Sequence, residues 1–94
     1  MKFDDFLKAA AKRPPAIVLH VAYACGIWVI RDLCRHGVPV LGLDVSPRAI
    51  GLSSRYAAGM VCPDPLHDES GFLAYLETLG RQLPRKAVLF PTHD

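Results

Sequence analysis

The chain has 94 residues, of which 51% are hydrophobic and 21% are charged, and its formal net charge is +2. This length predicts one domain with one core and leaves little room for an active site that holds several substrates. The composition is that of a folded globular protein rather than a disordered one. The small net charge and the scattered basic residues predict neither nucleic-acid binding nor attachment to an anionic membrane.

The cysteines and the longest apolar run indicate the cellular compartment and whether the chain crosses a membrane. Cys25, Cys34 and Cys62 are an odd number without C-x-x-C spacing, so we expect neither a disulfide framework nor a zinc knuckle. A reduced, cytoplasmic setting fits best. The apolar run over residues 16–30 is shorter than the roughly 20 residues that span a bilayer, and it contains His20, so no membrane span is expected.

The first half of the chain predicts a strand–helix–strand unit behind a short helix. Apolar residues at helical spacing indicate an amphipathic lead-in helix over residues 1–13, which two prolines end. A continuous apolar run over 16–21 is typical of a strand buried on both faces. Helical periodicity over 26–36 and a second apolar run over 38–43 complete a βαβ unit, in which the two strands are parallel.

The second half continues the alternation. Residues 46–58 are polar and rich in turn formers, and a brief third strand is expected at 60–62. Apolar spacing predicts a helix over 72–83, and a last strand follows over 87–90. The predicted fold class is therefore α/β, with a three-layer parallel sheet of about four strands in the order 3-2-1-4 and helices on its faces.

Sheets of this kind bind ligands outside the carboxyl ends of their strands, near the point where the winding reverses. The first turn, HVAYACG, keeps only Gly26 of the glycines in a dinucleotide fingerprint. Gly26 opens a helix whose free N–H groups favour an anion, although a plain turn explains it equally well. Asp44 follows 18 positions later, near the place of a ribose-binding acid. Many second strands, however, end in an aspartate that caps the next turn.

Two later segments carry further candidates. Arg55 in SSRY can grip a carboxylate or a phosphate with two hydrogen bonds, and a solvated loop is the equally good alternative. PTHD places Thr92 and Asp94 beyond the last predicted strand, in the region where ligands bind. Trp28 falls at the edge or outside of the sheet-facing side of its helix. It therefore predicts contact with a neighbouring domain or with a second copy of the chain, as in a homodimer.

Three segments together, WVIRDLCRHGVPVLGLD, GLSSRYAA and VLFPTHD, resemble the N-terminal domain that precedes the catalytic part of ATP-grasp enzymes, particularly the carboxylate–amine ligase-like members. The likeness covers residues 16–94. It implies a Rossmann-like domain that helps to bind the acid substrate, while later domains hold ATP and Mg²⁺. The family reaction activates a carboxylate as an acyl phosphate, which an amine then attacks. This chain departs from the family pattern at residues 22–25, which replace glycine-rich residues, and at His93, where serine is usual.

The resemblance implies that residues 1–94 form a single domain of a longer protein, inactive alone, with no catalytic residue, metal or cofactor of its own. Its substrate-binding residues are expected to be Gly26, Arg55, Thr92 and Asp94. Its expected partners are the downstream ATP-grasp domains of the same protein and a small carboxylate. Two alternatives remain: a stand-alone nucleotide- or NAD-binding module with Asp44 on the ribose, and a non-catalytic interaction domain.

Overall fold

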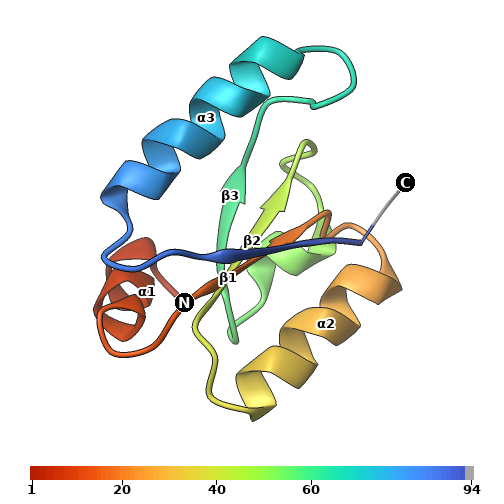
Figure 1. The fold of residues 1–94 in the computed structure, drawn as a ribbon. Coiled ribbons are helices and arrows are strands. Elements are labelled where there is room, and N and C mark those ends of the chain that lie inside the picture. Colours follow the sequence, from red (N-terminus) through yellow and green to blue (C-terminus); the bar gives the residue numbers. More distant parts are fainter. Residues whose placement is uncertain (93–94) are drawn as a thin grey trace.

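A computed structural model describes residues 1–92 (Figure 1). Its four parallel strands form one sheet in the order β3-β2-β1-β4, so the predicted α/β fold and strand order are confirmed. The strands are β1 (Ala16–Leu19), β2 (Val40–Asp44), β3 (Ala58–Val61) and β4 (Val88–Pro91). The helices are α1 (Phe3–Ala10), α2 (Ala24–Arg35) and α3 (Glu69–Gln82), together with a 3₁₀ helix, η1 (Ile50–Ser53).

The two central strands are apolar on both sides because helices cover both faces of the sheet. All residues of β1 and β2 are buried, as expected for parallel strands between helical layers. Helix α2 and η1 lie on one face, and α1 and α3 lie on the other. The predicted three-layer arrangement follows directly from this alternation of helix, strand and helix along the chain (Figure 1).

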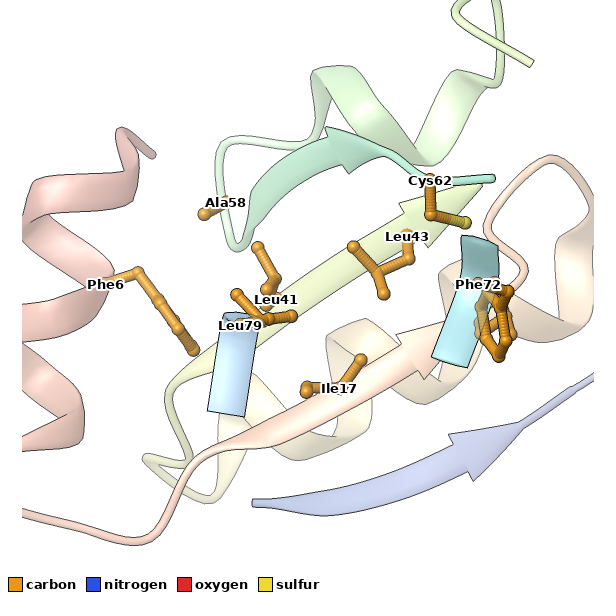
Figure 2. Packing of buried hydrophobic residues seen from close by; sticks show 9 residues of the cluster. Phe6, Ile17, Leu41, Leu43, Ala58, Cys62, Phe72 and Leu79 are labelled. Atoms are coloured by element: carbon orange, nitrogen blue, oxygen red, sulfur yellow. The ribbon is translucent and has the colours of Figure 1, made fainter. Parts of the chain in front are cut away.

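Two hydrophobic clusters fill the spaces between the layers. Beneath α1 and α3, the side chains of Phe6, Phe72 and Leu79 meet alternate residues of the central strands (Figure 2). On the opposite face, Ile30 of α2 packs with Val18 and its neighbours. Since full burial of one such side chain is worth about 1.5–3 kcal/mol, these clusters provide the main stabilisation of the fold.

Helices α2 and α3 both begin earlier than the sequence predicts. Helix α2 begins at Ala24, two residues before the predicted start, because its N-cap is an extended Tyr23 without a capping side chain. Helix α3 begins at Glu69, before its first apolar residue. There Asp68 caps the helix by accepting a hydrogen bond from the Gly71 N–H at 3.1 Å.

The 3₁₀ helix η1 lies in a stretch that the sequence predicts to be a loop. It is held by tertiary contact, because the Gly51 N–H donates to the Val21 carbonyl at 2.9 Å. Over residues 1–92, we find no helix with the length and apolarity to cross a membrane.

Candidate functional site

The point where the winding reverses lies between β1 and β4, whose carboxyl ends are neighbours in the sheet. Thr92, just after β4, ties these two ends together. Its N–H donates to the Leu19 carbonyl at 2.6 Å, and its hydroxyl donates to the His20 carbonyl at 2.7 Å. Figure 1 shows the end of β4 beside the loop that leads into α2. Thr92 therefore lies at the carboxyl ends of the strands, where ligand binding is predicted, and its hydroxyl is already hydrogen-bonded to the backbone.

Helix α2 begins beside the same carboxyl ends, and within residues 1–92 no side chain caps its N-terminus. No side chain accepts a hydrogen bond in the N-cap position, and its first turn contains no acidic residue. The first N–H groups of a helix have no partner within the helix, and they carry the positive end of its dipole. An anion at this edge would therefore find backbone donors and a favourable potential.

Gly26 has a packing role that the sequence alone could not separate from ligand binding. It is buried, and a Cβ at this position would collide with the His20 carbonyl oxygen. Glycine is thus required for the close approach of α2 to the end of β1, the role of the third glycine in a dinucleotide fingerprint. Gly26 and Thr92 converge on the same carbonyl group, so the structure brings these two predicted residues together.

The Asp44 carboxylate is buried and accepts hydrogen bonds from backbone N–H groups. Its side chain is 4% exposed, and its Oδ2 atom accepts hydrogen bonds from the Val21 and Ala22 N–H groups, each at 3.0 Å. Its Oδ1 atom accepts from the Ser46 N–H at 2.9 Å. The carboxylate therefore fastens the turn after β1 to the end of β2, and this use disfavours the ribose contact of the nucleotide-binding alternative.

Arg55 lies near the amino ends of the strands, so the structure does not bring it together with Gly26 and Thr92 as the sequence led us to expect. It precedes β3, and the carbonyl of the adjacent Tyr56 accepts a hydrogen bond at 2.8 Å from the Cys34 thiol, near the end of α2. Since α2 runs back along the sheet, this end lies beside the amino ends of the strands. Arg55 is exposed, and its guanidinium donates to the Tyr56 hydroxyl at 3.3 Å.

The fourth predicted residue, Asp94, lies outside the described residues, as does His93. Sequence reasoning also missed Arg31 and Arg35, which line a pocket beside Tyr56. Their four-residue spacing on one helix was the available signal.

The three thiols differ in their surroundings. Burial, and secondarily the negative charge of Asp44, raise the pKa of Cys62 to about 11, so this thiol is not a nucleophile near neutral pH. Burial also raises the pKa of Cys34. Cys25 is exposed in the first turn of α2. Within residues 1–92, no group of three or more His, Cys, Asp or Glu side chains is placed to hold a metal ion.

Comparisons with protein-family models, with curated proteins and with solved structures found no match to this chain.

Proposed function

We propose that this chain is the substrate-side, N-terminal domain of an ATP-grasp ligase-like protein and that it binds a small carboxylate between the carboxyl ends of β1 and β4. The observation that carries the proposal is the uncapped start of α2 at the point where the winding of the sheet reverses. The order of the three resembling segments, which covers residues 16–94, supports the choice of family.

The role of this edge would be to bind and orient the acid. The Ala24 and Cys25 N–H groups, in the first turn of α2, would donate to the carboxylate, and Thr92 would hold the two loops at a fixed separation. ATP and Mg²⁺ belong to other domains in this proposal, and they supply the phosphoryl transfer that activates the acid. The isolated chain is accordingly expected to lack ligase and ATPase activity. The unpaired cysteines suit a cytoplasmic location.

Contact with a further domain is supported by the exposed side of β4. Within the described part of the chain this strand pairs with β1 alone, and Val88 and Leu89 leave 57% and 43% of their surface exposed. Apolar side chains on an open edge strand favour association with more protein. In the proposal, this strand packs against the catalytic part.

A titration of the isotopically labelled chain with acetate, succinate and glycine tests the carboxylate site by amide chemical shifts. We expect saturable shifts centred on residues 22–26. Thr92→Val should weaken the response because it removes the hydroxyl that bonds the His20 carbonyl, whereas Thr92→Ser should retain it. Arg55→Lys is the control and should change nothing at this edge. An absence of saturable shifts at residues 22–26 would contradict the carboxylate site.

NAD and AMP added to the same sample test the nucleotide-binding alternative. Saturable binding of either molecule at residues 22–26, tighter than that of the carboxylates, would replace our proposal with a nucleotide-binding module. The buried position of Asp44 argues against that result.

A non-catalytic interaction domain is the second candidate, and the exposure of Trp28 favours it. This side chain is 73% exposed on the outer side of α2. Self-association of the chain without any response to carboxylates would support this candidate over a ligase domain.

A further inference from the structure

A pocket distinct from the carboxyl edge lies between the second half of α2 and the segment before β3. It has a volume of about 530 Å³ and is lined by Arg31, Cys34, Arg35 and Tyr56. This volume falls within the range of roughly 300–1,000 Å³ that is usual for small-molecule sites. The pocket lies near the amino ends of the strands, whereas Gly26 and Thr92 lie at their carboxyl ends.

Among the described residues, no carboxylate pairs with either of the two arginines of the pocket. Arg31 and Arg35 are one helical turn apart, so their side chains project from the same side of α2. Neither forms an ion pair with another residue of the described chain. The adjacent carboxylate of Asp32 instead faces the His36 ring, with Nδ1 and Oδ1 4.0 Å apart.

Arg31 and Arg35 are not needed to offset the negative end of the α2 dipole, because Arg13 already binds the carbonyl groups there. The Arg13 guanidinium donates to the His36 and Gly37 carbonyls at 3.2 and 3.1 Å. The negative end of a helix carries roughly half an elementary charge, which one guanidinium more than offsets. Arg31 and Arg35 therefore leave a net positive potential in the pocket.

A hydrogen bond from α2 holds the backbone of Tyr56 on the opposite wall of the pocket. The Cys34 thiol donates to the Tyr56 carbonyl at 2.8 Å, and its raised pKa keeps the proton that this bond requires. Arg55 lies over the Tyr56 ring at 5.3 Å from its centroid and donates to the phenol oxygen. The bond from α2 thus fixes the position of the Tyr56 backbone relative to Arg31 and Arg35, and Tyr56 in turn contacts Arg55.

We propose that this pocket binds the phosphate group of a small phosphorylated molecule, with Arg31 and Arg35 as donors to the phosphate oxygens and Tyr56 against the rest of the ligand. Planar guanidinium groups match the oxygens of a phosphate with pairs of hydrogen bonds. The two guanidinium groups together suit a dianion better than a singly charged carboxylate. The site is independent of the carboxylate site proposed above, because the two lie at opposite ends of the strands.

Inorganic phosphate is the first probe, added to the labelled chain at constant ionic strength while amide shifts are recorded, and AMP and acetate follow. We expect saturable shifts in residues 31–37 and 54–57, tighter binding of AMP than of inorganic phosphate, and weaker binding of acetate. Since a hydrogen bond to a charged group contributes about 1.5–3 kcal/mol, Arg31→Gln and Arg35→Gln should each weaken phosphate binding by about tenfold or more.

Arg81→Gln is the matched control, because Arg81 is an exposed helical arginine on α3, where it pairs with Glu77 at 3.5 Å. It should leave phosphate binding unchanged, and both pocket variants should keep the unfolding midpoint of the parent because Arg31 and Arg35 are exposed. The proposal is overturned if phosphate and AMP give no saturable shifts in these segments, or if the pocket variants bind phosphate as the parent does. Binding of RNA alone, with small phosphates silent, would also overturn it.

Discussion

The Asp44 carboxylate at the end of β2 accepts a hydrogen bond from the backbone N–H of Val21 at 3.0 Å and so fastens the turn that follows β1. The same carboxylate also accepts from Ala22 and Ser46. Two neighbouring strands are thereby joined at the edge where the proposed carboxylate site lies. The spacing suggested that Asp44 binds a ribose, but its carboxylate instead holds the backbone around the proposed carboxylate site.

Asp44→Asn should destabilise the protein by about 2–4 kcal/mol, because an amide has one acceptor oxygen and turns a donor toward the remaining N–H groups. Urea unfolding followed by circular dichroism measures the loss. Asp32→Asn, at an exposed position on α2, is the control and should change stability little. A loss below about 0.5 kcal/mol for Asp44→Asn, the scatter of ordinary surface substitutions, would show that these bonds contribute nothing net.

Gly26→Ala and Gly80→Ala should change stability in opposite directions, although both glycines lie in helices. At Gly26 the added Cβ meets the His20 carbonyl, so the end of β1 must shift, at a cost of about 1–3 kcal/mol. At Gly80 no described atom lies within 4 Å of the added Cβ, so alanine should stabilise by about 0.5–1 kcal/mol. Thermal unfolding distinguishes the two, and equal effects would contradict the packing role of Gly26.

The stability of the folded chain should fall between pH 9.0 and about 11. Burial raises the pKa of Cys62 from 9.0 to about 11, so in this interval the unfolded chain binds fewer protons than the folded one. The contribution lost is at most about 2–3 kcal/mol, and it levels off once the folded thiol also ionises.

Cys62→Ala removes this ionisation, while Cys34, whose pKa burial also raises, titrates in both proteins. The variant also removes the Cys62 charge, which after burial is the second cause of the raised pKa of Tyr75. Denaturant unfolding across the interval should show a steeper decline for the parent than for the variant. Parallel declines would mean that Cys62 ionises in the folded protein as it does in the unfolded one.

Trp28 reports directly on partner binding because it is the one tryptophan of the chain and is 73% exposed. In a monomeric sample its fluorescence should be red-shifted and readily quenched by acrylamide. Contact with a second copy or with a catalytic domain should shift the emission to the blue and protect it from quenching. Trp28→Glu should weaken that association without changing the unfolding midpoint. A protected indole in a monomer would place the contact surface elsewhere.

The sequence by itself determined the layers and the strand order. Continuous apolar runs at 16–21 and 38–43 are typical of strands buried between two helical layers, and the short crossover that joins them favours parallel pairing with a right-handed connection. The exposed side of α2 at Trp28 was likewise predictable, since its angle around the helix follows from its position relative to Ile30.

Only the tertiary structure determined the hydrogen-bond partners and the positions of the polar residues. The spacing that suggested a ribose contact for Asp44 contains no information on which N–H groups its carboxylate would meet, and three backbone donors occupy it. Arg55 lies near the amino ends of the strands because it comes just before β3, which begins at Ala58. The sequence does not show how far the chain has run back along the sheet by that point. Apolar periodicity fixes which face of an element is buried, whereas hydrogen-bond partners are set by the path of loops, where such periodicity is absent.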